Sequence, residues 1–218
     1  MHRAHKSINA FNVLRSLWVA KLPLMVALGG LLICTSGCVT SVNVPLVYKP
    51  TNASPTGGGL GISAASLYVA PVQDWRPDQK QIGANREHAT AIPAYSTDAT
   101  PTQFVHDVMV SQLPGVGVRV VKTLDEGDRI LLLGIKYMWV EETSRYEARI
   151  TLQARVQDRT GATLWSGDVE GADSTFGRSL NPEDYTQVLS NAMLQVCWNL
   201  AGDPGFAKSM QPSGGSSK

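Results

Sequence analysis

The chain has 218 residues, of which 43% are hydrophobic and only 17% are charged, with a formal net charge of +1. Because charged residues make up about 25% of an average soluble domain, these figures exclude a highly charged disordered protein and a basic nucleic-acid-binding protein. The length is sufficient for one or two domains with a buried hydrophobic core.

The first 37 residues differ in character from the rest of the chain. They hold four basic residues and no acidic one, so residues 38–218 keep 15 Lys+Arg against 18 Asp+Glu and carry a net charge of −3. The basic residues precede an apolar run at residues 22–34 and the small residues Thr35, Ser36 and Gly37. This order is typical of a secretory signal peptide over residues 1–37, and the run is shorter than the roughly 20 residues of a membrane-spanning helix.

The sequence Thr35-Ser36-Gly37-Cys38 resembles the lipobox of bacterial lipoproteins, with Thr35 in the place of the commoner Leu. The resemblance implies that the Cys38 thiol receives a diacylglycerol, that signal peptidase cuts between Gly37 and Cys38, and that the new amino group is acylated. Several acyl chains together make a stable membrane anchor. Val39 follows the cysteine, which by the sorting rule of enterobacterial lipoproteins implies an outer-membrane protein that faces the periplasm. The alternative is an ordinary cleavable signal peptide in which Cys38 has no special role.

The chain has three cysteines, and their positions predict no intramolecular disulfide. Cys34 leaves with the signal peptide and Cys38 is acylated, so that only Cys197 remains as a thiol. We expect Cys197, which lies in a predicted helix, to be a small buried hydrophobic residue.

Composition divides the exported chain into three parts. Residues 38–62 are rich in Pro, Thr, Ser and Gly, which predicts a flexible tether behind the lipidated cysteine, with one short extended stretch at residues 42–48. A single folded domain is expected over residues 63–204. The apolar content of residues 205–218 is low, which predicts a disordered tail.

Two helices are predicted from cap signals and apolar periodicity. Thr100, Pro101 and Gln103 form a capping box, and the helix that they start ends at Pro114. Asn181 caps the second helix. Its apolar residues recur at helical spacing and form one stripe: Tyr185, Val188, Leu189, Ala192, Met193, Val196 and Leu200.

The remaining apolar segments predict strands. They cover residues 67–72, 116–121, 129–140 with a bulge or bend at Gly134, 146–157, and 163–169. The fourth alternates apolar and polar residues over its whole length, which is strong evidence for a half-buried strand. A polar loop is expected at residues 74–100, too long for an ordinary connection. Together these elements predict an α+β fold, a two-layer sandwich in which two helices cover one face of a mainly antiparallel sheet of four to five strands, in the order β-α-β-β-β-β-α.

Several short sequences look like those of the YajG-like bacterial outer-membrane lipoproteins. They are VAPVQDWRPDQKQIG from Val69 to Gly83, the strand from Tyr146 to Arg149, Leu164-Trp165, and GRSLNP from Gly177 to Pro182. The resemblance covers most of residues 66–204 and implies a membrane-anchored domain that faces the periplasm, without implying a reaction. The order of elements is more distantly similar to that of the auxiliary lipoproteins of ABC-type lipid transporters.

The sequence holds no nucleophile elbow, no phosphate-binding loop and no convincing metal-ligand spacing. We therefore expect no catalytic residue, no metal, no cofactor and no nucleic-acid partner.

Trp and Arg are enriched where proteins bind partners, and a polar cluster after the first strand combines both types. The candidate partner-binding residues are Asp74, Trp75, Arg76, Asp78 and Arg178. The alternative is a structural charge network that holds the loop to the sheet. On the polar face of strand 146–157, the alternating charges of Glu147, Arg149 and Arg155 predict cross-strand ion pairs in water.

The sequence therefore favours a non-catalytic lipoprotein, anchored to the outer membrane, that acts as an interaction or accessory domain for an envelope protein or a transporter. One alternative is an accessory lipid-binding component of an ABC-type transport system. Another is an envelope hydrolase that uses the carboxylates Asp74, Asp78, Glu141 and Glu142, two of which should then share one pocket. The sequence indicates no oligomeric state.

Overall fold

The structure is a computed structural model that describes residues 40–52, 65–87 and 89–211. The expected signal peptide, the lipidation and cleavage site at Gly37 and Cys38, and residues 212–218 of the expected tail lie outside the described residues. The described elements are β1 (Val42–Pro45), β2 (Ser66–Val69), β3 (Gln73–Asp74), β4 (Gln81–Asn85), β5 (Ile92–Thr97), α3 (Pro101–Gln112), β6 (Arg119–Val121), β7 (Arg129–Glu142), β8 (Arg145–Asp158), β9 (Thr163–Phe176), α4 (Pro182–Gly202) and α5 (Pro204–Ser209).

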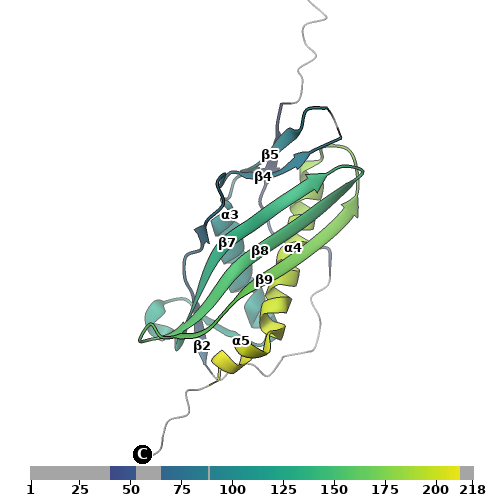
Figure 1. Ribbon diagram of the computed structural model, residues 1–218. Helices are drawn as coiled ribbons and strands as arrows, with labels where there is room; N and C mark the ends of the chain where they lie inside the picture. Colours follow the sequence, from purple (N-terminus) through teal and green to yellow (C-terminus); the bar gives the residue numbers. More distant parts are fainter. Residues whose placement is uncertain (1–39, 53–64, 88, 212–218) are drawn as a thin grey trace, which may run out of the picture. The chain divides into compact units, whose positions relative to one another are not determined.

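Strand β7 organises the sheet (Figure 1). On one side it pairs with β8, which pairs with β9, and both pairings are antiparallel. On its other side β2, β3 and β4 pair with it one after another, all parallel to it. Residues 66–85 thus run beside β7 as one interrupted strand. Three more short strands complete the sheet: β6 pairs with β2, β5 with β4, and β1 with β5.

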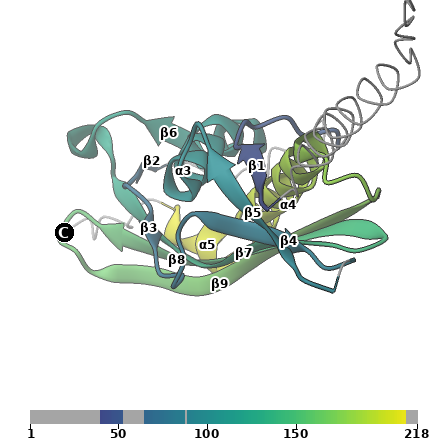
Figure 2. The same cartoon turned by 90° about the horizontal axis from the view of Figure 1, so that it is seen from above.

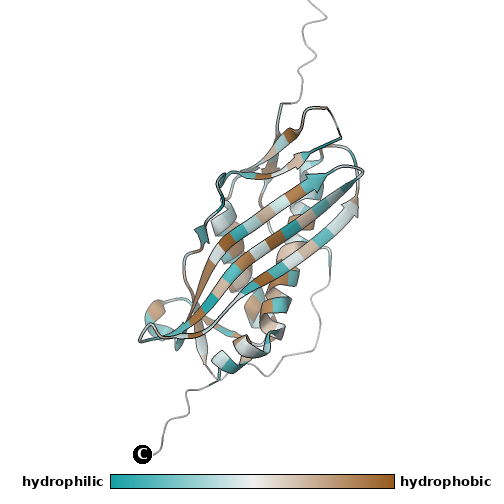
Figure 3. Cartoon of the chain, viewed as in Figure 1, coloured by the Kyte–Doolittle hydropathy of each residue, from teal (hydrophilic) through white to brown (hydrophobic). Residues whose placement is uncertain are grey.

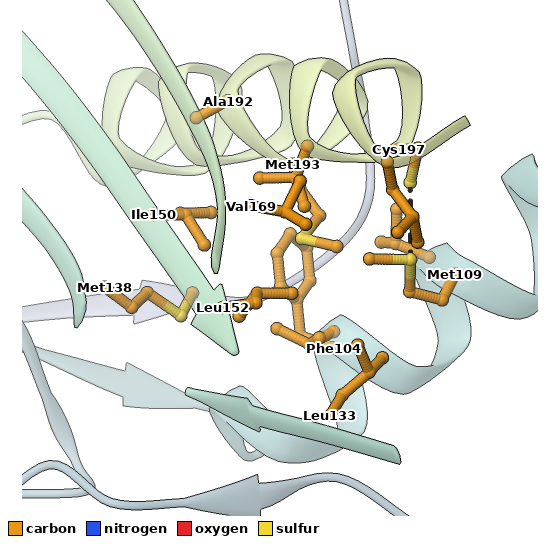
Figure 4. Close-up of a cluster of buried hydrophobic side chains, with 14 of the residues drawn as sticks. Phe104, Met109, Leu133, Met138, Ile150, Leu152, Val169, Ala192, Met193 and Cys197 are labelled. Atoms are coloured by element: carbon orange, nitrogen blue, oxygen red, sulfur yellow. Dashed lines mark hydrogen bonds between the residues drawn. The ribbon is translucent and has the colours of Figure 1, made fainter. Parts of the chain in front are cut away.

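The three long strands have one buried and one outer face. Hydrophilic and hydrophobic residues alternate along β7, β8 and β9 (Figure 3), and the inward side chains of β8 from Tyr146 to Val156 are all buried, as the sequence predicts. Helices α3 and α4 lie behind these strands in Figure 1, on the buried side. Met138, Ile150 and Leu152 from the strands meet Met193 and Phe104 from the helices in the core (Figure 4).

Helix α4 is buried on more sides than one apolar stripe predicts. The Asn181 side chain caps it by accepting a hydrogen bond from the Glu183 backbone N–H at 3.2 Å, and every residue of the predicted stripe is buried. Three polar residues, Thr186, Ser190 and Asn191, are buried as well. The helix therefore has a second covered side, which the polar sequence there does not indicate.

The N-terminal segment supplies that second cover. Strand β1 falls within the extended stretch predicted at residues 42–48, but the flexible tether predicted around it is wrong for the rest of residues 42–52, which pack on the domain. Strand β1 pairs with β5, and the chain after it crosses α4, where Ser190 and Asn191 accept hydrogen bonds from the backbone N–H groups of Lys49 and Thr51 at 3.0 and 2.9 Å. Figure 2 shows β1 beside α4. The segment is ordered because it satisfies polar groups of α4, which a scan for apolar periodicity does not detect.

The expected loop at residues 74–100 is likewise interrupted by two strands, which the sequence did not predict. It contains β4 and β5, an antiparallel pair in which Gly83 lies opposite Ala94. Gly83 approaches the backbone of Val140 so closely that a β-carbon would collide with its carbonyl oxygen. These short strands are rich in small and polar residues, so they lack the pattern by which strands are recognised.

The disordered tail predicted over residues 205–218 is wrong for its first part, because α5 covers Pro204–Ser209. Phe206 and Met210 are fully buried, and the guanidinium of Arg129 donates hydrogen bonds to the carbonyl oxygens of Ser209 and Gln211, both at 2.9 Å. Two apolar anchors and one buried arginine thus order a segment whose average composition is polar.

The α+β class is confirmed, but the described residues form a sheet of nine strands and not of four or five. Within the ranges that the structure describes, no helix has the length and hydropathy needed to cross a membrane.

Candidate functional site

The outer face of β7, β8 and β9 presents aromatic side chains to solvent. Trp75 follows β3, and its backbone N–H donates to the Ile135 carbonyl at 3.1 Å, which places the side chain over β7. The indole covers Gly134 so closely that a β-carbon at that position would collide with the ring. Although its ring is packed on β7, Trp75 remains 51% exposed. Trp75 is therefore a fixed aromatic surface and not a mobile loop residue.

A β-bulge adds two more aromatic residues to this face. The register of β7 against β8 shifts between Ile135 and Tyr137, so that Lys136 is an extra residue. Before the bulge the odd-numbered residues of β7 face the core, and after it Met138 and Val140 do. Because of this shift, Tyr137 and Trp139 face outward, and Tyr137 is 44% exposed. We call Trp75, Tyr137 and Trp139 the aromatic face.

Two hollows lie along the aromatic face. One, of about 250 Å³, is lined by Trp75 together with Leu132 and Arg155. The other, of about 650 Å³, is lined by Tyr137 and Trp139 together with polar residues of β8 and β9: Glu147, Arg149, Asp173 and Ser174. The larger hollow thus combines an aromatic wall with several charged groups, and the smaller one combines it with a single charged group, Arg155.

The charges on this face are not paired as the sequence predicts. Among the described residues, Glu147, Arg149 and Arg155 form no salt bridge, whereas Lys136 binds Asp168 of β9 at 2.6 Å. The predicted cross-strand ion pairs of these β8 residues are wrong. Each residue lies opposite an uncharged or like-charged residue on β7 and an uncharged residue on β9; Arg149, for example, lies opposite Trp139 and Ala172. The charges are left for solvent or a partner.

Arg76 and Asp74, two of the predicted partner-binding residues, form a buried network. The Arg76 guanidinium makes two bonds to the Asp74 carboxylate, at 2.9 and 2.7 Å, and the two side chains are only 7% and 3% exposed. The remaining guanidinium N–H groups donate to the carbonyl oxygens of Gln79, Gln81 and Met138 at 2.9, 2.9 and 3.1 Å. Arg76 thereby closes the loop between β3 and β4 and joins it to β7.

Asp78 and Arg178, the other two polar candidates, lie in local structure. The Asp78 carboxylate accepts hydrogen bonds from the backbone N–H groups of Gln81 and Lys80, each at 3.0 Å, and these bonds lower the pKa of Asp78. Arg178 binds Glu87 at 3.3 Å and is not part of the Arg76 network. Of the five candidates, only Trp75 belongs to the aromatic face.

The carboxylates weighed for a hydrolase have separate environments. Asp74 is bound by Arg76, and Glu141 lies 3.3 Å from Arg86 at the surface. Glu142 is fully buried and accepts hydrogen bonds from the Tyr185 hydroxyl and the Leu180 backbone N–H, both at 2.9 Å. Within residues 40–52, 65–87 and 89–211, no three His, Cys, Asp or Glu side chains gather as metal ligands would. That the protein is not an enzyme stays a prediction.

Comparison with known proteins shows the fold. Neither the protein-family models nor the curated proteins contain a match to the chain. Among solved structures it resembles protein XCC0632 from Xanthomonas campestris, described as family DUF330, with 18% sequence identity over 73% of this chain and 92% of that one and a TM-score of 0.52. The two chains therefore share a fold.

Two further solved structures are named as lipoproteins. One is a putative lipoprotein from Caulobacter crescentus, with 11% identity over 61% of this chain and 93% of that one. The other is a minor lipoprotein from Acinetobacter baumannii, with 10% identity over 63% of this chain and 89% of that one. The TM-score is 0.38 for both. The specific YajG-like assignment stays a prediction.

Proposed function

We propose that the chain is a non-catalytic bacterial lipoprotein, anchored by an acylated Cys38 to the outer membrane, whose α+β domain binds a protein partner in the periplasm through the aromatic face. The observation that carries the proposal is the set of three outward aromatic side chains, one of them fixed over Gly134 and two turned outward by the bulge in β7. Tyr, Trp and Arg dominate the binding energy of protein interfaces, and this face holds all three.

The size of the face supports a protein partner. Strands β7, β8 and β9 each have 14 residues, and at about 3.3 Å per residue they extend about 45 Å. With neighbouring strands about 5 Å apart, the outer side chains cover an area close to the roughly 800 Å² that one partner buries in a standard interface. The charged lining of the larger hollow suits a folded protein surface better than an acyl chain.

A photoreactive amino acid placed at Tyr137 tests the docking part of this proposal. Val110 on α3 is a matched control, because it is 38% exposed and its helix lies on the other side of the sheet. We expect one discrete cross-linked product in envelopes from position 137 and none from position 110. Gly134→Ala should abolish the product, since the new β-carbon displaces the Trp75 ring. Equal products from both positions, or a product that Gly134→Ala leaves unchanged, would contradict docking at this face.

The anchor is tested separately by Cys38→Ala. We expect the variant to leave the membrane fraction, because one residue carries all acyl chains. A Cys38→Ala protein that sediments with the outer membrane as before would disprove the anchor.

A further inference from the structure

One end of the sheet carries the start of the folded chain. Strand β1 begins at Val42, which pairs with Ala94, and pairing continues from strand to strand through Val140 of β7 to Asp173 of β9. These residues form one row across the sheet. Thr40 and Ser41, which precede Val42, lie beyond this row in the same direction as the last residues of β7 and β9. In Figure 1 this is the upper end, where β7 and β9 have their arrowheads.

An aromatic and a cationic side chain project at this end. Phe176, the last residue of β9, is 80% exposed, the largest exposed fraction among the large hydrophobic residues that the structure describes. It pairs across the sheet with Arg145, so both side chains lie on the same face. Arg145 donates a hydrogen bond to the Ser174 hydroxyl at 2.7 Å and makes no salt bridge with a described residue. Exposure of a large apolar side chain to water is unfavourable, so contact with an apolar partner would lower the free energy of Phe176.

The chain between the expected lipid anchor and the domain is short. The described structure begins at Thr40, two residues after Cys38, and is folded from Val42 onward. Three residues, 39–41, join Cys38 to the first strand residue, Val42, and these four Cα-to-Cα steps span at most about 14 Å. That is about twice the thickness of the headgroup region on one side of a bilayer. The end of the domain that carries Val42 is therefore close to the lipid when Cys38 is acylated.

We infer that this end of the domain, with Phe176 and Arg145, lies against the bilayer surface, with the phenyl ring in the boundary between headgroups and acyl chains and the guanidinium on lipid phosphates. The inference rests on the proposed anchoring through Cys38. Aromatic rings are favoured at this depth of a membrane because they are largely apolar. Arginine is favoured there because its apolar stem lies among the lipids while its charged tip reaches the headgroups. The strands then stand on the membrane by one end, and the aromatic face remains open to a partner at the side.

An environment-sensitive dye at position 176 tests the orientation. The lipidated protein with Phe176→Cys is labelled with a thiol-reactive dye and reconstituted in vesicles of phosphatidylethanolamine and phosphatidylglycerol that contain nitroxide-labelled lipid. Cys197 is fully buried, so position 176 carries the accessible thiol once Cys38 is acylated. Leu164→Cys is the matched control, because Leu164 is 41% exposed and lies at the opposite end of the same strand.

We expect the dye at 176 to lose emission to the nitroxide lipids and the dye at 164 to keep its emission, with the first at a depth of about 5–10 Å, as for interfacial apolar groups. Unquenched emission at both positions, in protein that floats with the vesicles, overturns the orientation and leaves the anchor intact. Lipidated protein that does not float with the vesicles refutes the anchoring itself and the orientation with it. A third variant, Arg145→Gln, should reduce the quenching at 176 in these anionic vesicles; unchanged quenching would overturn the role of Arg145.

Discussion

The buried Arg76 network makes a quantitative prediction that separates a structural role from a binding role. Arg76→Met keeps most of the volume of the side chain and removes the guanidinium, so packing of the stem is largely preserved. The change leaves the Asp74 carboxylate, whose side chain is 3% exposed, without its cation. It also removes the donors that serve the carbonyl oxygens of Gln79, Gln81 and Met138.

The expected loss follows from this geometry. Breaking a buried ion pair by removing one partner costs about 3–5 kcal/mol of folding free energy, because an uncompensated charge remains inside the protein. With a urea m-value of about 2 kcal/mol/M, the midpoint of unfolding should fall by roughly 2 M. The measurement is urea denaturation of the mature protein followed by far-UV circular dichroism, with Arg178→Met as the matched control. Arg178 forms an ion pair with Glu87 that is 64% exposed on the arginine side, so its loss should cost only about 0–1 kcal/mol.

Two results would refute this reasoning. A shift below about 0.5 M for Arg76→Met, or a shift equal to that of Arg178→Met, would mean that the guanidinium does not hold the loop to β7. Replacing Asp74 as well should recover part of the lost stability, because the uncompensated charge is then removed. If the double variant is instead less stable than Arg76→Met alone, that result would also contradict the network.

Three further predictions follow from close packing, burial and hydrogen bonding. Gly171→Ala should destabilise the protein by about 1–3 kcal/mol in the same urea assay, because a β-carbon there collides with the Ala192 carbonyl oxygen of α4; an unchanged midpoint would show that β9 and α4 can separate at no cost. Burial raises the pKa of the Cys197 thiol to about 12, so an aromatic disulfide reagent should react with it only after unfolding, and rapid reaction in the native protein would contradict its burial. Hydrogen bonds from Ser66 lower the pKa of Asp128, so its stabilisation is complete above about pH 4, where an unfolded Asp is ionised, and is lost as the pH falls through the lowered value of the folded state. The difference in Tm between the wild type and Asp128→Asn should therefore be largest near neutral pH and shrink as the pH falls below about 4; a constant difference would contradict the assignment.

Strong local patterns in the sequence correctly predict two of the long elements, β8 and α4. The alternation from Tyr146 to Gln157 and the cap and stripe of the helix after Asn181 are both as expected in the structure. In these elements each residue's own preference agrees with its place in the core, so local reasoning is sufficient.

The missed elements depend on contacts between distant residues. Strand β4 is recognisable only beside β7, and the segment that crosses α4 is ordered by the buried side chain of Asn191. Of the aromatic face, the sequence singled out Trp75 and missed Tyr137 and Trp139. The bulge at Lys136 is what turns these two side chains outward, because the core-facing residues of β7 have odd numbers before it and even numbers after it. The sequence of β7 is apolar almost throughout, so this change is not visible in the sequence.

The crossing of residues 42–52 over α4 also has a consequence for the timing of folding. The hydrogen bond between Thr51 and Asn191 joins residues 140 positions apart, so the first segment that the structure describes is held by one of the last. Contacts of such long range form late and slow the folding reaction. The core therefore cannot close completely until α4 has been synthesised. This late closure is compatible with the export that we propose, because a secretion channel requires an unfolded chain.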